Sequence, residues 1–244
     1  MKYTKEEFTE KCISAFALNR LECTAAQGEL FYSLTERMLT VNEHLNLTAI
    51  KDEDLIICRH YADSAFLSEY IPEGAKVIDV GCGAGFPTLP LAILRPDLKI
   101  TALDGTAKRI TYVKETAELL GLSGVRAVAA RAEELAHDSG EREKYDIVTA
   151  RAVAALPVLS ELCLPFVRVG GQMIAMKAAL ADEEIKASES AISLLGGRIS
   201  ERKSSQLLSS VEEPASRCLV IVDKVKKTSP LYPRHYSKIS KKPL

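Results

Sequence analysis

The first seventy residues carry apolar side chains at helical spacing. One such set recurs every three or four residues: Leu30, Leu34, Met38, Val41 and Leu45. This spacing places the apolar side chains on one face of a helix, and similar spacing occurs in residues 8–18 and 55–67. Residues 1–71 are therefore predicted to form a helical extension packed on the main domain. Pro72-Glu73-Gly74 then interrupts the pattern.

Beyond residue 72, strand and helix patterns alternate. Strands are predicted at 76–80, 99–103, 125–129, 145–149, 172–176, 197–203 and 217–225. Helices are predicted at 90–94, 107–120, 158–167 and 182–195. This alternation predicts an α/β domain over residues 72–225, with a mostly parallel sheet covered by helices on both faces. The last two strands have no clear helix between them, which favours an antiparallel hairpin at the sheet edge.

Composition narrows the class of protein. A hydrophobic content of 47% with 27% charged residues is typical of a globular chain rather than a disordered one. The six cysteines include no CxxC pair, which argues against a zinc site and against a secreted disulfide framework. The N-terminus is polar, and the longest apolar run, 152–159, is far shorter than the ~18 residues of a membrane span. We expect a cytoplasmic protein with neither metal nor membrane.

Charge is unevenly distributed although the net charge is only −1. The last 21 residues contain no acidic side chain and seven basic ones: Lys224, Lys226, Lys227, Arg234, Lys238, Lys241 and Lys242. Such a segment can serve as an electrostatic arm for a phosphate backbone. It can equally be a solvated terminus. Residues 226–244 are therefore interpreted as a basic C-terminal tail, with both roles left open.

The segment VIDVGCGAGF, residues 77–86, is the strongest indication of a ligand site. Gly81, Gly83 and Gly85 directly follow an apolar strand, where a doubly wound sheet binds its cofactor. The dinucleotide fingerprint GxGxxG requires glycine at the position of Phe86. The spacing therefore favours a cofactor without pyrophosphate, such as an adenosyl sulfonium. An ordinary glycine turn is the alternative.

Acidic residues near the strand ends suggest how the cofactor is held. Asp104 ends the second strand, where a carboxylate can accept hydrogen bonds from two ribose hydroxyls, although it would also fit an NAD ribose. Asp79 could orient the loop or the amino group of the cofactor, or simply cap the turn. Ala132 and Glu133 follow the third strand, where an adenine edge would lie.

Eight segments match one known family in the same order along the chain. They are NLTAI (46–50), RHYADSAF (59–66), DVGCGAGFPTLPLAI (79–93), KR (108–109), RAEEL (131–135), YDIVTARAV (145–153), Lys177 and YPRHYSKISKKPL (232–244). In these segments the chain resembles the ribosomal RNA small-subunit methyltransferase G family, also called glucose-inhibited division protein B. The resemblance implies a Rossmann-like class I methyltransferase fold, with a seven-stranded, mostly parallel sheet and an N-terminal helical extension.

The same resemblance implies the reaction and the partners. It implies an S-adenosyl-L-methionine-dependent methyltransferase that modifies N7 of one guanine in 16S small-subunit ribosomal RNA. The partner is then 16S ribosomal RNA or the small ribosomal subunit, and the protein is expected to be a monomer. Departures from the family pattern are Cys82 and Thr88 in the glycine loop, Ala178-Ala179 after Lys177, and Gly105-Thr106 after Asp104. These departures affect the expected local shape of the loops and leave the expected reaction unchanged.

The family's site residues map onto particular positions here. The resemblance implies cofactor contacts at Gly81, Phe86, Ala132, Glu133 and Arg151, to which the loop interpretation adds Gly83 and Asp104. It implies RNA-facing basic side chains at Arg131, Lys177 and Arg234. Lys177, Arg131 and Arg151 are the residues expected to act in methyl transfer. Each basic residue could instead be a structural ion-pair partner or a solvated strand end.

The chemistry of the target agrees with this set of residues. Guanine N7 has a lone pair and no proton, so the enzyme must align it with the methyl carbon and needs no general base. The (N/D)PP(Y/F) motif of exocyclic-amine methyltransferases is absent at 150–152. Three alternatives stay open: methylation of another RNA base or of a protein side chain, a non-catalytic RNA-binding ribosome assembly factor, and a nicotinamide oxidoreductase.

Overall fold

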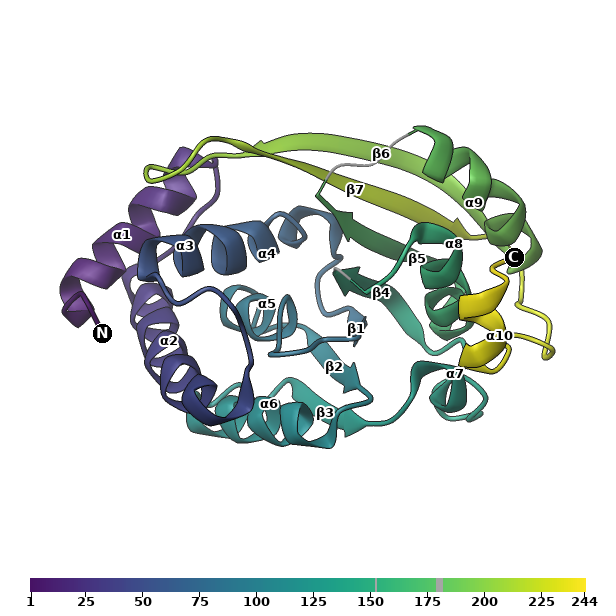
Figure 1. Ribbon diagram of the computed structural model, residues 1–244, viewed down its shortest axis with the longest axis horizontal. Helices are drawn as coiled ribbons and strands as arrows, with labels where there is room; N and C mark the ends of the chain where they lie inside the picture. Colours follow the sequence, from purple (N-terminus) through teal and green to yellow (C-terminus); the bar gives the residue numbers. More distant parts are fainter. Residues whose placement is uncertain (152, 179–181) are drawn as a thin grey trace.

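A computed structural model describes residues 1–151, 153–178 and 182–244, and its centre is a seven-stranded sheet (Figure 1). The strands are β1 (Lys76–Val80), β2 (Lys99–Asp104), β3 (Val125–Ala129), β4 (Tyr145–Arg151), β5 (Val167–Lys177), β6 (Gly197–Leu207) and β7 (Ala215–Lys224). Their order is β3-β2-β1-β4-β5-β7-β6. The first five strands are parallel and β7 runs antiparallel between β5 and β6. The predicted fold class is confirmed, including the antiparallel hairpin at the edge.

The helices follow in chain order. They are α1 (Lys5–Leu18), α2 (Ala25–Leu45), α3 (Glu53–Ile56), the π-helix η1 (Ile57–Ala62), α4 (Asp63–Ala65), the 3-10 helix η2 (Ser68–Tyr70), α5 (Thr88–Leu94), α6 (Ala107–Leu119), α7 (Ala132–Leu135), α8 (Leu156–Cys163), the 3-10 helix η3 (Leu164–Phe166), α9 (Asp182–Leu194) and α10 (Tyr236–Lys241). The predicted helix at 158–167 is wrong at its end, because η3 replaces its last turn and Val167 already begins β5. Pro165 explains this, since it supplies no N–H for a continuing α-helix.

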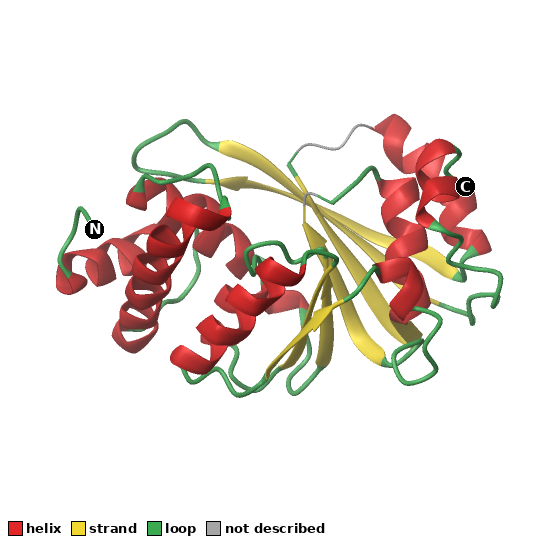
Figure 2. Ribbon diagram, turned by 60° about the horizontal axis from the view of Figure 1, so that its bottom comes forward, coloured by secondary structure: helices red, strands yellow, loops and turns green. Residues whose placement is uncertain are grey.

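Helices cover both faces of the sheet (Figure 2). Alternating side chains of β1 show the two layers: Val77 packs in one cluster with Leu91 of α5, whereas Ile78 packs in another with Leu159 of α8. The helices α5 and α6 therefore lie on one face, and α8 and α9 lie on the other.

The N-terminal helices form a continuous core with the α5 side of the sheet. Thr4 and Thr24 begin α1 and α2 with capping boxes, each side chain accepting from a backbone N–H three residues on. Phe31 of α2 stacks on Tyr61 of η1 with ring centroids 4.5 Å apart. The helical character of the N-terminus is confirmed, while the division at residue 71 stays a prediction.

The β6–β7 hairpin extends beyond the sheet to the N-terminal helices (Figure 1). Beyond the end of β6, the backbone N–H of Leu208 donates to Asn19 Oδ1 (2.8 Å), and Asn19 Nδ2 donates to Leu208 O (2.9 Å). Glu212 in the connecting loop pairs with Arg59 of η1. The hairpin therefore joins the two ends of the fold across one edge of the sheet.

Two wider features of the fold bear on function. In the part of the chain that the structure describes, no helix is both long enough and apolar enough to cross a membrane. Within the same ranges, no three His, Cys, Asp or Glu side chains gather in a possible metal site. Two positions from the sequence analysis lie outside the described residues: residue 152, within 150–152, and Ala179 after Lys177.

Candidate functional site

The glycine loop after β1 adopts a backbone that favours glycine. Gly81 and Gly83 have φ angles of 75° and 57°, in the left-handed region. A Cβ at Gly81 would lie 2.7 Å from Cγ2 of Val153, so a side chain there would be both strained and crowded. The N–H groups of Gly81 and Cys82 donate to Leu103 O at 2.8 and 3.0 Å. These bonds hold the loop against the end of β2.

Asp104 organises the loop from the neighbouring strand. Its Oδ2 accepts from the N–H of Gly83 (3.0 Å), and its Oδ1 accepts from the N–H of Thr106 (2.8 Å). Each carboxylate oxygen has a second acceptor site, so Asp104 can still receive two hydroxyl donors from a ligand. Only 9% of Asp104 is exposed, and its exposed part faces the first cavity described below.

Asp79 has a different role from Asp104. Its carboxylate accepts from Thr88 Oγ1 (2.7 Å) and Thr149 Oγ1 (3.2 Å), and it is buried. Burial raises the pKa of Asp79 to about 6, although the two hydroxyls act in the opposite direction. Asp79 therefore ties β1 to α5 and β4. This geometry favours the structural interpretation of Asp79 over a ligand contact.

A cavity of about 320 Å³ lies at the carboxyl ends of β1 and β2; we call it the first cavity. Its lining comprises Val80, Gly81, Leu103, Asp104, Gly105, Thr106, Arg109, Ala130, Arg131, Ala132, Glu133, Val153, Leu162 and Tyr236. Five of the predicted site residues therefore line one cavity: Gly81, Asp104, Arg131, Ala132 and Glu133. The cavity lies at the carboxyl ends of parallel strands, where doubly wound sheets bind ligands. Four of the seven predicted cofactor-binding residues line it, whereas Gly83, Phe86 and Arg151 do not.

Phe86 and Arg151 do not line the first cavity. The ring of Phe86 stacks on His60 with centroids 4.3 Å apart, and the guanidinium carbon of Arg151 lies 5.4 Å from the Phe86 centroid. Phe86 is 6% exposed, so its side chain belongs to the core between the loop and the N-terminal helices. Direct cofactor contacts of these two side chains stay predictions.

Arg151, at the end of β4, is held by the N-terminal helices. Its Nη1 donates to Arg59 O (3.0 Å) and to Asp63 Oδ2 (3.3 Å), and its Nη2 lies 3.4 Å from His60 Nδ1. Since an arginine can only donate, Nδ1 of His60 is the acceptor and its Nε2 donates to Thr48 Oγ1 (3.0 Å). Burial and the nearby Arg151 lower the pKa of His60 to about 3, so this imidazole is neutral.

A second cavity of about 390 Å³ lies between the N-terminal helices and the ends of β5 and β7. It is lined by Ile50, Arg59, His60, Asp63, Phe66, Arg151, Met176, Lys177, Ala178, Ser205, Arg217, Cys218 and Leu219. Asp63 is 5% exposed and joins the two arginines, because its Oδ1 accepts from Arg217 Nε at 2.6 Å. The network spans the second cavity from β4 to β7.

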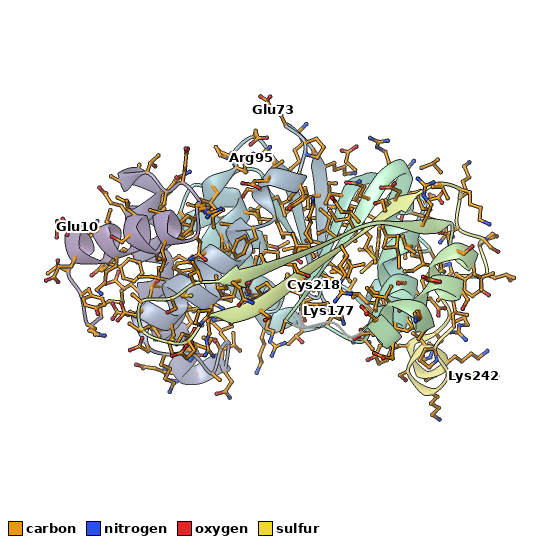
Figure 3. All side chains as sticks on the ribbon, turned by 90° about the horizontal axis from the view of Figure 1, so that it is seen from above. Glu10, Glu73, Arg95, Lys177, Cys218 and Lys242 are labelled. Atoms are coloured by element: carbon orange, nitrogen blue, oxygen red, sulfur yellow. The ribbon has the colours of Figure 1, made fainter. Side chains whose placement is uncertain are left out.

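Lys177 ends β5 and is paired with Cys218 of β7, in the centre of the molecule as Figure 3 shows. Its ammonium donates to Ala154 O (2.7 Å) and to Glu184 Oε1 (3.0 Å). The two cavities lie at the same end of the sheet. The carboxyl ends of the parallel strands and the start of the antiparallel β7 come together there.

The remaining basic candidates are also paired. Arg131 Nε lies 3.2 Å from Glu133 Oε1, and half of the Arg131 side chain is exposed. Arg234 makes a bidentate ion pair with Glu161, whose side chain is fully buried. The structural ion-pair interpretation therefore holds for Arg234 in this conformation, and its contact with RNA stays a prediction.

Two comparisons among cavities and residues complete the site. A larger hollow of about 630 Å³ lies at the opposite end of the sheet, near the amino ends of β1 and β4. None of the predicted site residues lines it. Conversely, several lining residues were not predicted from the sequence, and four of them make the polar or aromatic contacts described here: His60, Asp63, Arg217 and Tyr236. Three of them lie in matched segments, 59–66 and 232–244, but their spacing alone indicated no chemistry.

The chain is similar to known proteins of one family over most of its length. The family model described as rRNA small subunit methyltransferase G matches residues 27–209. The chain is 45% identical over 222 residues to ribosomal RNA small subunit methyltransferase G of Lactobacillus delbrueckii subsp. bulgaricus, covering 89% of this chain and 92% of that protein. The protein of the same name from Lactobacillus acidophilus is 40% identical over 239 residues, with 96% and 98% covered. Among solved structures, M. jannaschii TYW2 in complex with AdoMet has a TM-score of 0.52 at 15% identity, covering 67% and 75%. That likeness shows the fold.

Proposed function

Because this chain belongs to the rRNA small subunit methyltransferase G family, we propose that it transfers the methyl group of S-adenosyl-L-methionine to N7 of a guanine in 16S ribosomal RNA. The family, the enzyme class and the cofactor predicted from the sequence are confirmed by this membership. The guanine position, the site residues and the RNA contacts form the proposal. The observation that supports it most directly is that two cavities share the edge of the sheet at which the glycine loop lies.

The first cavity fits the methyl donor. The carboxylate of Asp104 lines this cavity, and it has two acceptor sites for ribose hydroxyls. Gly81 brings backbone without a side chain to the wall of this cavity, and Phe86 stands where a pyrophosphate site would need glycine. Ala132 and Glu133 also line this cavity, and we place the adenine beside them. S-adenosyl-L-methionine, when bound, supplies the electrophilic methyl group.

The second cavity is our site for the target guanine. Ile50, Phe66, Met176 and Leu219 give it apolar walls, which suit the faces of a base. Lys177 and Arg151 lie at strand ends on its border, and we assign them the alignment of the base with the methyl group. Attack by N7 releases no proton, so no general base is needed. The neutral His60 adds no positive charge against the cationic methylated base.

Contacts with the rest of the RNA involve other side chains. Arg131 is half exposed at the mouth of the first cavity, and we assign it a phosphate contact. Arg234 would contact RNA only by leaving Glu161 or by sharing its guanidinium. A monomeric state and a cytoplasmic location stay predictions from the sequence.

Transfer of a tritiated methyl group tests the reaction. We expect label from S-adenosyl-L-methionine in 16S ribosomal RNA, offered either naked or as assembled small subunits, and none in a protein control. Cleavage of the labelled RNA at N7-methylguanine should place the label at one position. Label in another base or in protein would contradict the proposed target. An assembly factor without turnover would give no label.

Lys177→Ala tests the assignment within the site. We expect at least a tenfold loss of methyl transfer with unchanged affinity for S-adenosyl-L-methionine, because Lys177 lines the second cavity and not the first. Lys186→Ala is the matched control, since Lys186 is exposed on α9. Native transfer rates in Lys177→Ala would assign that residue to structure alone.

A further inference from the structure

The basic C-terminal segment is packed on the fold rather than extended. Arg142 donates to the carbonyl oxygens of Thr228 (2.9 Å), Ser229 (3.0 Å) and Tyr232 (2.9 Å). Lys224, the first of the seven basic residues, is buried and donates to Thr228 Oγ1 at 2.7 Å. A segment whose backbone carbonyls are held by one guanidinium has a defined path over the surface.

Two further anchors lie on either side of Tyr236. Two residues before it, Arg234 forms its bidentate ion pair with the buried Glu161 of α8. Three residues after it, Ile239 is 0% exposed and packs in the cluster beneath α8. Tyr236 is therefore held in place from both sides, and Figure 1 shows α10 beside α7 and α8.

Tyr236 faces the first cavity. It lines that cavity together with Arg131, Ala132 and Glu133. The guanidinium of Arg131 lies 4.8 Å from the ring centroid of Tyr236, and Arg131 is itself oriented by Glu133. Yet 38% of Tyr236 remains exposed. A positioned aromatic ring that is partly open to a cavity is suited to pack against a flat heteroaromatic ligand.

We infer that Tyr236 packs against the adenine of S-adenosyl-L-methionine, and that residues 228–241 serve the cofactor site by holding this ring in place. The inference rests on the proposed function, because it requires the methyl donor to occupy the first cavity. Asp104 then binds the ribose, and the adenine lies beyond it, between Tyr236 and the start of α7. The C-terminal segment is accordingly needed for cofactor binding even when no RNA is present.

Titration calorimetry with the full chain and S-adenosyl-L-methionine, without RNA, tests the inference. For Tyr236→Ala we expect about tenfold weaker binding, the size of a contact between an aromatic side chain and a base. Tyr236→Phe keeps the ring and should bind within about twofold of the unchanged protein. Leu231→Ala is the matched control, because Leu231 is in the same segment, is 77% exposed and does not line the first cavity.

Two measurements make each outcome decisive. Thermal unfolding without ligand checks that Tyr236→Ala remains folded. Hydrogen exchange of residues 228–241 should slow when S-adenosyl-L-methionine is added. Equal cofactor affinity in Tyr236→Ala and the unchanged protein would overturn the inference and leave the proposed function intact. Loss of RNA affinity alone would also overturn it, because the ring would then stack on RNA. Failure of the unchanged protein to bind the cofactor would instead count against the proposed function.

Discussion

The two cavities at the edge of the sheet are built in different ways. Most of the lining of the first cavity comes from one continuous stretch, residues 80–133, and its geometry depends on backbone hydrogen bonds to Leu103 and Asp104. The second cavity collects side chains from Ile50 to Leu219. Its central contacts join Asp63 to partners 88 and 154 residues away.

The shape of the first cavity thus depends on local backbone conformation. The shape of the second cavity depends on side chains that are distant in the sequence. A glycine loop keeps its shape through a few residues of permitted backbone conformation. A buried carboxylate between two arginines depends on the packing of the N-terminal helices against the sheet, and it is costly to leave incomplete. Mutations should therefore affect cofactor affinity at the first cavity, and stability together with methyl transfer at the second.

The largest effect is expected from Asp63→Ala. Removing this buried carboxylate leaves Arg151 and Arg217 without their shared partner, which should lower the free energy of unfolding by about 3 kcal/mol. Urea unfolding measures the change. Glu69→Ala is the control, because Glu69 is exposed on η2. A loss below about 1 kcal/mol would mean that the network contributes no more than a surface ion pair.

Asp104→Ala should have the next largest effect, on cofactor affinity rather than on stability. Both carboxylate oxygens hold the loop, and both are assigned to ribose hydroxyls, so we expect about 100-fold weaker binding of S-adenosyl-L-methionine. Asp104→Asn retains one acceptor oxygen and should be intermediate. Calorimetry gives both values, and unchanged affinity in Asp104→Ala would contradict the cofactor site.

His60, which lines the second cavity, should make the free energy of unfolding depend on pH. Its pKa is about 3 in the folded protein and about 6.5 when unfolded, so the unfolded chain binds more protons below pH 6.5. The stability from neutral His60 is present above pH 6.5 and is lost as the pH falls toward 3, with about 2 kcal/mol lost between pH 7 and pH 5.

The variant His60→Asn tests this contribution of His60 to the pH dependence of stability. The amide oxygen of asparagine can still accept from Arg151, but it does not titrate. Urea unfolding at several pH values should therefore show a shallower decline below pH 6.5 than in the unchanged protein. Identical slopes for the two proteins would show that His60 is not held neutral by its surroundings.

The smallest effect is expected from the exposed lysines of the C-terminal segment. Replacing Lys238, Lys241 and Lys242 by alanine should weaken RNA binding a few-fold at moderate salt and reduce the slope of log affinity against log salt by about 2. Cofactor affinity without RNA should not change. Lys99→Ala, at the amino end of β2 and in neither cavity, is the control. An unchanged slope would leave this face of α10 without phosphate contacts.

Point substitutions test the segment better than truncation does. Removing the chain after Asp223 would also remove the buried side chains of Lys224, Thr228 and Ile239. Such a truncated protein would lose core contacts beneath α8 as well as charge. Any change in its RNA affinity would therefore mix stability with electrostatics.

The sequence predicted the sheet well because strand and helix periodicity is local. Seven strands, their mostly parallel arrangement and the final hairpin all follow from it. Errors occurred at element ends: β5 begins at Val167, five residues before the predicted start, because Pro165 ends the helical turn. The same locality explains why Gly81 and Asp104 were identified, since both directly follow or end a strand.

The sequence alone determined the sheet, the glycine loop and the class of cofactor, because each depends on conformational preferences over a few neighbouring residues. Tertiary structure decided the rest. Only packing showed that Phe86 and Arg151 join the N-terminal helices, that Asp63 meets Arg217, and that a tail identified by its charge carries Tyr236 to the first cavity. Contacts between segments that lie far apart in the chain leave no spacing pattern in a single sequence, so the fold has to bring them together before their chemistry can be recognised.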